Sequence, residues 1–425
     1  MSSTMVRILQ TGTFNSMNKG DAAMQISMAD ALAHDIPSAK VLISTPFPDL
    51  DRDFYKDYEL VICSRRRLIW ASFQLLRAML WGLFDRVGLK LNWLVPEREL
   101  QEYLKADLVV DLSGDMLTED YGPHVVYSHY LPLLLAIMLR RPFVACAQSI
   151  GPFGLTKPLA RFILNKAQFI TTRDQISMDY LLGMGIRPEL LTKTADMAFL
   201  LRPAPRDKAL ALLEKEGFTP DSQRPLMGMS LSRLVESKYT RKNLNAASQD
   251  MVDLFASVLD EASEKYGVDI VFIPHVTGPA ASKDDRRIHA EVQASMHARS
   301  HVITGEYTPS ELKSVIGLCE TMFGARMHAN IGALSSGIPT LAIAYSHKTP
   351  GIMSVLGQSE LVLDISTLNR QAVMEKLAYL HAQKDAIKQA LDEARTRVEA
   401  ASQVSVDMIA KLVSGLSYSG NNRQP

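Results

Sequence analysis

Short apolar runs alternate along most of the chain with longer segments in which apolar residues recur at helical spacing. The runs Val6 to Gln10, Ala39 to Ser44 and Phe143 to Gln148 have the length of buried strands. The segment 251–266 instead places its apolar residues on one helical face. Strands that alternate with helices form parallel sheets with helices packed on both faces. The pattern therefore predicts an α/β protein.

This alternation is interrupted once by a polar stretch with prolines near both ends, Arg202 to Pro225. We therefore expect two doubly wound parallel-sheet domains that face each other across a cleft, followed by a helical C-terminus rich in Ala, Lys, Glu and Gln. The predicted parts are an N-terminal α/β domain at 1–205, a hinge at 206–224, a C-terminal α/β domain at 225–366, helices at 367–416 and a disordered tail at 417–425.

The segment Thr321 to Lys348 has the pattern strand, turn, helix, strand, loop. Arg326 and His328 fall in the first turn of the helix, and Ser346, His347 and Lys348 follow the second strand. Both places lie beyond the carboxyl ends of parallel strands, where ligands bind, and a helix start offers unpaired N–H groups. The pattern predicts a small anionic ligand with a phosphate or carboxylate group. The alternative for each residue alone is a solvated or packing role.

The loop after the first strand contains Gly12, Asn15, Asn18 and Asp21. We expect Asp21 to cap a helix that starts at about Ala22. The glycine spacing is not that of a dinucleotide-binding loop, whereas the two asparagines and Asp21 suit hydrogen bonds to sugar hydroxyls. The alternative is that these residues are ordinary turn formers.

A second loop, Ser113-Gly114-Asp115, follows the strand Asp107 to Leu112. Asp115, with Glu119 and Asp120 after it, is a candidate for a general base or for binding hydroxyl groups. Arg173 follows another strand and adds a cation at the same predicted edge. The alternative is again that these charged side chains face solvent.

Charge and cysteine usage exclude several classes of protein. Lys plus Arg and Asp plus Glu both number 46, so no overall charge favours nucleic acid. The three cysteines, Cys63, Cys146 and Cys319, have neither zinc-site nor disulfide spacing and favour a reducing compartment. The chain enters a strand at once, which leaves no room for a signal peptide. We expect a cytoplasmic protein without a metal site.

The segment 65–94 combines three leading arginines with three tryptophans and many leucines. Arg77 and Asp85 leave no apolar run long enough to cross a membrane. The composition suits a helix that lies in a membrane surface, which would put the protein at the inner face of the cell membrane. The alternative is a buried helix that covers the sheet.

Several motifs in order resemble those of the polysaccharide pyruvyl transferase family. The opening loop matches G-x-x-N-x-x-N-x-G-D-x-A, and the later matches are Gln148 to Pro152, Thr171 to Asp174, Thr194 to Phe199, the G-x-R-x-H-A of Gly324 to Ala329, and the Y-x-x-K of Tyr345 to Lys348. Two positions depart from the family pattern, since Asp115 and Ser149 stand where glycine is more common.

The resemblance implies a fold similar to that of GT-B glycosyltransferases. It also implies transfer of pyruvate from phosphoenolpyruvate, as co-substrate, onto two hydroxyls of a glycan or lipid-linked sugar as a cyclic ketal, without a further cofactor. Arg173, His328 and Lys348 match the family's cationic positions. We expect Arg173 and Lys348 to neutralise charge, His328 to bind phosphate or act as general acid, and Asp115 or Asp21 to orient or deprotonate the acceptor.

Two other functions remain open at this point. The first is a nucleotide-sugar glycosyltransferase of the same fold. The second is a non-catalytic sugar-binding or scaffold protein in a polysaccharide assembly complex, which the departures at Asp115 and Ser149 would suit.

Overall fold

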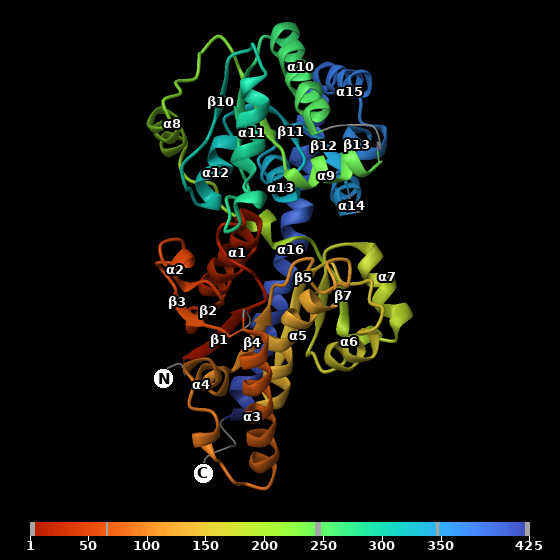
Figure 1. Ribbon diagram of the computed structural model, residues 1–425. Coiled ribbons are helices and arrows are strands. Elements are labelled where there is room, and N and C mark those ends of the chain that lie inside the picture. The colour runs from red at the N-terminus through yellow and green to blue at the C-terminus, as the bar shows by residue number, and fades with distance from the viewer. Residues whose placement is uncertain (1–4, 65–66, 243–247, 346–347, 421–425) are drawn as a thin grey trace. The chain divides into compact units, whose positions relative to one another are not determined.

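The computed structural model describes residues 5–64, 67–242, 248–345 and 348–420 (Figure 1). The chain divides into two compact units. Unit 1 comprises Met1–Ser16, Met24–Leu200 and Ala400–Pro425, and unit 2 comprises Met17–Ala23 and Leu201–Glu399. Each unit contains one parallel sheet with helices around it.

Unit 1 is built on a seven-stranded sheet in the order β3-β2-β1-β4-β5-β6-β7. All neighbouring strands pair in parallel. The strands are β1 Val6–Thr11, β2 Ala39–Thr45, β3 Glu59–Ile62, β4 Leu108–Asp111, β5 Phe143–Gln148, β6 Ile170–Thr172 and β7 Leu191–Lys193. The strand order reverses between β1 and β4, which is the point at which doubly wound sheets bind ligands.

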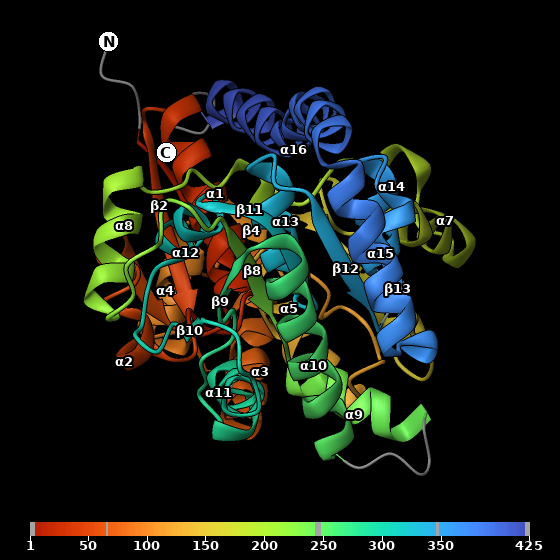
Figure 2. The same ribbon diagram turned by 90° about the horizontal axis from the view of Figure 1, so that it is seen from above.

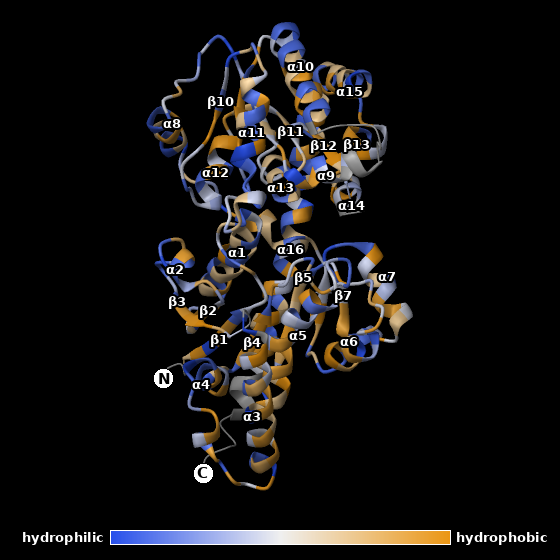
Figure 3. Cartoon of the chain, in the orientation of Figure 1, coloured by the Kyte–Doolittle hydropathy of each residue, from blue (hydrophilic) through white to orange (hydrophobic). Residues whose placement is uncertain are grey.

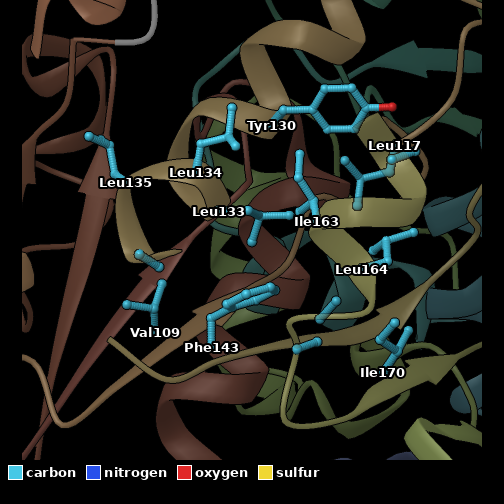
Figure 4. Close-up of a cluster of buried hydrophobic side chains, with 14 of the residues drawn as sticks. Val109, Leu117, Tyr130, Leu133, Leu134, Leu135, Phe143, Ile163, Leu164 and Ile170 are labelled. Carbon is cyan, nitrogen blue, oxygen red and sulfur yellow. The ribbon is translucent and has the colours of Figure 1, made fainter. Parts of the chain in front are cut away.

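Helices α1 to α7 are α1 Lys19–Asp35, α2 Pro48–Asp51, α3 Leu68–Arg86, α4 Arg98–Lys105, α5 Pro123–Met138, α6 Lys157–Leu164 and α7 Gln175–Met184. Short 3-10 turns lie at Asn92–Leu94, Pro188–Leu190 and Met197–Leu200. Figure 4 shows the core of unit 1, where Val109 and Phe143 from the sheet pack with Leu133 of α5 and Ile163 of α6. This apolar layer fixes the strands whose ends carry the polar loops.

Unit 2 has a six-stranded parallel sheet in the order β10-β9-β8-β11-β12-β13. The strands are β8 Leu226–Ser230, β9 Asp269–Phe272, β10 Ser300–Val302, β11 Cys319–Gly324, β12 Thr340–Ala344 and β13 Val362–Asp364. Its order reverses between β8 and β11. One core cluster joins Val271 and Met322 of the sheet to Leu312 and Ala333 of the helices.

The remaining helices are α8 Arg206–Lys215, α9 Arg233–Lys242, α10 Ser248–Tyr266, α11 Asp285–Ala294, α12 Pro309–Ile316, α13 Met327–Ser335, α14 Lys348–Val355, α15 Arg370–Ala382 and α16 Lys384–Gly420, with 3-10 turns at Ala281–Lys283, Ser359–Leu361 and Ile365–Thr367. In unit 2, α10 and α15 lie side by side (Figure 2). A capping box of Thr308 and Glu311 starts α12.

The structure confirms two doubly wound parallel-sheet domains and a helical C-terminal region. Several details differ from the expectations drawn from the sequence. The segment 206–224, expected as a hinge, contains α8, and the division between units falls at Leu200 and Leu201. The edge strand β13 was not expected. Helix α16 continues to Gly420, into the segment expected as a tail, while 421–425 lie outside the described residues.

The first helix also starts earlier than expected. We predicted a start at about Ala22 with Asp21 as the cap, but α1 begins at Lys19. Asn18 takes the capping role, because its side-chain oxygen accepts a hydrogen bond from the Gly20 N–H at 3.1 Å. The Asn18 side-chain nitrogen donates to Asp21 at 2.9 Å. The cap prediction for Asp21 was therefore wrong, since the carboxylate instead steadies the capping asparagine.

Candidate active site

The reversal point of the unit 1 sheet brings the first two predicted loops together. Gly12 follows β1 with a φ of +99°, and a Cβ atom there would lie 2.6 Å from both Asp111 Oδ1 and the Ser113 nitrogen. Glycine alone fits this conformation at this distance. The predicted binding residues Gly12, Ser113 and Gly114 therefore share one edge of the sheet.

A buried polar network lies beneath these loops. The side-chain amide of Gln148 donates to Asp111 Oδ2 at 2.6 Å, and Ser113 Oγ donates to Asp111 Oδ1 at 3.1 Å. Ser113 Oγ also lies 3.0 Å from Nδ1 of His129, a residue of α5. The sequence analysis missed Asp111 and His129. The available signal was a carboxylate that ends an otherwise apolar buried strand.

The backbone of β5 directs Gln148 into this network. Ala147 has a φ of +52°, unusual for a residue with a side chain, and the pairing of β5 with β6 shifts register between Ala145 and Gln148. The Ala147 nitrogen donates to Thr171 Oγ1 at 2.7 Å, which holds this irregular turn in place. The bulge aims the Gln148 amide at Asp111, where a regular strand would point it elsewhere.

Arg173 is a buried cation at the same edge of unit 1. Its Nη1 pairs with Asp196 at 2.5 Å and its Nε donates to Ser149 Oγ at 2.8 Å, whereas Nη2 has no hydrogen-bond partner within the described part of the chain. Burial opposes its charge, but the nearby carboxylates of Asp196 and Asp115 outweigh this effect and raise its pKa. Arg173 is therefore a fixed positive charge whose Nη2 amino group, with two N–H bonds, faces no acceptor in the described part of the chain.

Ser149 connects Arg173 to a helix. Its hydroxyl accepts from Arg173 and donates to Asp174 Oδ2 at 2.7 Å. Asp174 in turn caps α7 by accepting from the Ser177 nitrogen at 2.7 Å. The hydroxyl thus orients the guanidinium group.

The C-terminal helix α16 supports the same edge. Ser402 Oγ donates to the Asp196 carbonyl at 2.9 Å, and Ser405 Oγ lies 2.9 Å from Thr171 Oγ1. The last part of the chain thereby fixes the carboxylate that pairs with Arg173.

The predicted acidic candidates differ in their surroundings. Asp115 accepts a hydrogen bond from the Tyr121 hydroxyl at 3.0 Å and lies near Arg173. Glu119 accepts from the Thr156 hydroxyl at 2.6 Å and nitrogen at 2.7 Å, and these bonds lower its pKa. Glu119 therefore braces the loop before α6. Asp115 is the candidate whose charge acts on Arg173.

The reversal point of the unit 2 sheet holds Arg326 and His328. Both follow β11, and α13 begins at Met327 between them. Arg326, the N-cap residue of α13, makes no side-chain capping hydrogen bond. The N–H groups in the first turn of any helix are not bonded within the helix itself, and such groups suit an anion. His328 is half-buried in this first turn. The helix start and the histidine thus lie where the sequence analysis put an anion.

Arg326, expected to bind substrate, forms a bidentate pair with buried Asp285, with contacts from Arg326 Nη2 at 2.6 Å and from Nε at 3.0 Å. Asp285 also accepts from the backbone nitrogens of His275 and Val276 at 3.1 and 2.9 Å. Burial opposes the Arg326 charge, but Asp285 outweighs this and raises its pKa. In unit 2, Arg326 ties the loop after β9 to the start of α13.

The opening loop contributes to unit 2 as well as to unit 1. Residues Met17–Ala23 belong to unit 2, where Asn18 forms a bridge with Val276 and the Lys19 nitrogen donates to the His275 carbonyl at 2.8 Å. Gly20 packs against the His328 imidazole. The predicted residues Asn18 and Asp21 therefore belong to unit 2 and flank, in sequence, the glycine that contacts His328, although we had assigned them to the N-terminal domain.

A buried lysine next to this loop escaped the sequence analysis. The Lys19 side chain is only 1% exposed, and its Nζ pairs with Glu306 at 3.0 Å. The same glutamate accepts from Thr277 at 2.9 Å and pairs with Arg286 at 2.9 Å. Lys19 and Glu306 are 287 positions apart, so no local pattern could have paired them.

Other predicted residues lie elsewhere or beyond the described part of the structure. Asn15 is buried in unit 1. Ser346 and His347 lie outside the described residues, and Lys348 begins α14 but its side chain is not among those described. Within the described residues, no group of three or more His, Cys, Asp or Glu side chains is placed to hold a metal ion.

The chain is similar to known proteins in both sequence and structure. The amylovoran biosynthesis protein AmsJ of Erwinia amylovora is 25% identical over 395 residues, which span 88% of this chain and 91% of that protein. Among solved structures, a putative UDP-N-acetylglucosamine 2-epimerase from Listeria monocytogenes matches with a TM-score of 0.58 at 14% identity, covering 97% of each chain. Anabaena HepE in complex with UDP-glucose matches with a TM-score of 0.57 at 13% identity, over 96% of this chain and 99% of that one.

The two structural matches show the fold, which is GT-B-like. The sequence model of the polysaccharide pyruvyl transferase family matches residues 18–347, a range that includes Asn18, Arg173, Arg326 and His328. The chain is therefore a member of the polysaccharide pyruvyl transferase family.

Proposed function

We propose that this protein transfers pyruvate from phosphoenolpyruvate onto two hydroxyl groups of a sugar in a polysaccharide or lipid-linked glycan, as a cyclic ketal. Family membership supports a transferase, and the relative named for amylovoran biosynthesis supports a role in making an exopolysaccharide. The cysteines, which lack disulfide spacing, suit a cytoplasmic enzyme.

The observation behind the donor assignment is the position of His328 in the first turn of α13, directly after β11. Phosphoenolpyruvate has a carboxylate and a phosphate on one small carbon frame. Unpaired N–H groups at a helix start bind such anions, and the helix dipole favours negative charge there. Because Arg326 is already neutralised by Asp285, His328 is the side chain that we assign to the phosphate.

The chemistry requires a balanced movement of two protons. One proton reaches the methylene carbon of phosphoenolpyruvate and makes the methyl group. The two sugar oxygens then bond to C2, the bond between C2 and the phosphate oxygen breaks, and inorganic phosphate leaves with the second proton. Both protons come from the sugar hydroxyls. The net reaction therefore needs an acid, a base and cations, but no redox cofactor.

We assign these roles to the residues whose type fits them. His328 binds the phosphate or supplies the proton, since an imidazole can hydrogen-bond a phosphate oxygen and can also donate a proton. Arg173 neutralises negative charge through Nη2, with Lys348 in the same role on the strength of the family motif. Asp115 or Asp21 orients or deprotonates the acceptor. Ser113, Gly114, Gly12 and the asparagines would contact the sugar.

The test is release of inorganic phosphate from phosphoenolpyruvate, measured with and without a panel of synthetic and membrane-extracted glycans. We expect release that depends on a glycan and a methyl ketal in the product by NMR. His328→Ala should abolish release in a folded protein, while His297→Ala, an exposed histidine of the same unit, should leave it unchanged.

Two outcomes would contradict the proposal. Transfer of a sugar from a UDP-sugar to the same glycans, without use of phosphoenolpyruvate, would indicate a glycosyltransferase. Binding of glycan without turnover or heat from phosphoenolpyruvate would indicate a scaffold protein.

A further inference from the structure

Helix α3 turns its small residues toward the protein. Ala71, Ala78 and Gly82 are buried against the rest of unit 1, together with Gln74 and Trp81. A Cβ atom on Gly82 would overlap the carbonyl oxygen of Met138 in α5. Glycine is therefore required for the close approach of α3 to α5. Most of the large apolar side chains of α3 therefore lie outside the face that packs on the protein.

The opposite face of α3 exposes large apolar side chains. They recur at alternating spacings of four and three along the helix, which places them in one stripe, and they are 36–91% exposed. The stripe consists of Ile69, Phe73, Leu76, Leu80, Leu83 and Val87. We call these six residues the apolar stripe. A helix that packs only against a protein core has the reverse arrangement, with its large apolar residues buried.

Further apolar side chains widen this surface. Trp70 and Phe84 flank the stripe on the helix, and Leu89 and Trp93 continue it beyond the helix end. All four are 39–71% exposed. Figure 3 shows the hydrophobic colouring along α3. The alternative of a helix buried over the sheet is therefore wrong for α3.

The chain around the stripe has an excess of positive charge, although Arg77 is paired with Glu97 at 2.5 Å. The segment 65–96 contains the cations Arg65, Arg66, Arg67, Arg77, Arg86 and Lys90 but a single acid, Asp85, in a chain whose overall charge is zero. Asp85 is already paired with Arg140 at 2.7 Å. Arg67 is exposed at one end of the stripe, and Arg86 and Lys90 are exposed at the other. An apolar strip with cations at both ends is complementary to an anionic, amphipathic surface.

We propose that the apolar stripe, with Trp70 and Trp93, docks on the surface of a bilayer that contains anionic phospholipid. Such a helix lies in the interface with its apolar side chains among the acyl chains and its cations at the lipid headgroups. Tryptophan favours this interface. No helix in the described part of the chain is long and apolar enough to cross a membrane, so α3 would lie along the surface.

The charge pattern also argues against a second copy of this chain as the occupant. Two stripes packed against each other would bring the cations of both copies together, and the acids needed to neutralise them are lacking in this segment. Anionic lipid supplies the missing charge. The inference rests on α3 alone and does not depend on the proposed function, but it would hold the enzyme at a membrane that bears a lipid-linked acceptor.

The chain offers a direct readout, because all three of its tryptophans lie in this segment. Trp70 and Trp93 are exposed, and Trp81 is buried with its indole N–H on Asn92 at 3.2 Å. Adding vesicles of phosphatidylglycerol and phosphatidylcholine to the full-length protein should shift tryptophan emission to the blue, and brominated lipids should quench it. Vesicles of phosphatidylcholine alone, or high salt, should weaken both effects at least tenfold.

Variants distinguish binding through the apolar stripe from nonspecific adsorption of exposed apolar residues. Leu76→Glu with Leu80→Glu should reduce the fraction that floats with anionic vesicles at least tenfold. The matched control, Leu155→Glu with Ile176→Glu, changes two exposed apolar residues elsewhere in unit 1 and should leave flotation unchanged. Arg86→Glu with Lys90→Glu should weaken binding to anionic vesicles only. Thermal unfolding should confirm that each variant folds.

Three results would overturn the proposal. The first is an unchanged emission spectrum of the wild-type protein with anionic vesicles. The second is equal flotation of the stripe variant and its control. The third is a dimer in analytical ultracentrifugation that Leu76→Glu with Leu80→Glu converts to a monomer, without any vesicle binding by the wild type, because that would make the stripe an interface between two copies.

Discussion

Gly20 lies so close to His328 that a Cβ atom on the glycine would come within 2.8 Å of the imidazole Cε1 and closer still to Nδ1. Gly20 sits in the first turn of α1 and His328 in the first turn of α13, and both belong to unit 2. The two family motifs that contain them, separated by most of the chain, thus meet at one contact. The glycine leaves the imidazole the space that its present position requires.

Gly20→Ala tests this contact. Helix propensity alone predicts that the alanine would stabilise the protein by about 1 kcal/mol, because Gly20 is helical. We expect instead a loss of stability and of phosphate release from phosphoenolpyruvate, since the imidazole must move. Urea unfolding and the phosphate assay measure the two effects.

The double variant Gly20→Ala with His328→Ala supplies the control. Removing the imidazole removes the clash, so the alanine should no longer destabilise, and the two changes should be non-additive by about 0.5–3 kcal/mol. Strict additivity would mean that the contact has no energetic consequence.

The pair of Arg173 and Asp196 leads to a second prediction. Both side chains are buried, so Asp196→Ala would leave a guanidinium group without its counter-charge. We expect a loss of about 3–5 kcal/mol in the free energy of unfolding. Glu189→Ala, which breaks the exposed pair with Arg187, should cost about 0–1 kcal/mol under the same denaturant titration. Similar costs for both variants would show that the buried pair is not needed for stability.

The sequence predicts the sheets well because their signal is local. A run of apolar residues such as Phe143 to Gln148 matches β5 residue for residue. The same local pattern put Gly12, Ser113, Arg326 and His328 shortly after strands, where the structure has them. The strand β13 escaped because it has only three residues and lies at the sheet edge. A segment that short contains too little periodicity to identify.

What the sequence does not predict is which charges neutralise each other. Arg326 looks like a ligand-binding residue until the fold brings Asp285, 41 positions away, against it. The division of the opening loop between the two units also depends on tertiary structure. Gly12 belongs to unit 1 and Asn18 to unit 2, and no local sequence feature marks the boundary between them. The fold determines which residues pair when they are far apart in the sequence. The spacing of residues within a motif contains no information about such pairs.

Gly12→Ala provides a third prediction, at the reversal point of the unit 1 sheet. The alanine would have an unfavourable positive φ and would also collide with Asp111 and the Ser113 backbone. Gly217→Ala is the matched control, because Gly217 has a φ of +81° but no atom within 4 Å of its Cβ position. The control should cost about 1–2 kcal/mol for backbone strain alone. Gly12→Ala should cost clearly more in thermal or urea unfolding, and equal costs would contradict the role of the contact.

Two buried histidines of unit 2 predict how stability depends on pH. Burial lowers the pKa of His289 to about 3, and its Nε2 accepts a hydrogen bond from the Leu231 nitrogen at 2.9 Å, which occupies the atom that would bind the proton. Burial lowers the pKa of His275 to about 4. Both values lie below the pKa of about 6.5 for histidine in an unfolded chain. Between these values the unfolded chain binds more protons than the folded one, so acidification favours unfolding.

Each histidine therefore stabilises the folded protein fully above about pH 6.5, and this contribution is lost as pH falls toward the folded-state pKa, by about 1.4 kcal/mol per pH unit. His289→Gln keeps an acceptor for the Leu231 nitrogen but cannot be protonated. We expect its free energy of unfolding, measured in urea from pH 7.5 to pH 4.5, to fall less steeply than that of the wild type, with a difference of about 2 kcal/mol accumulated by pH 5. His297→Gln, at an exposed position, controls for the change of residue and should follow the wild-type slope. Carboxylates contribute equally to the pH dependence of all three proteins. If the free energy of unfolding of His289→Gln fell with pH as steeply as that of the wild type, burial would not be holding His289 neutral.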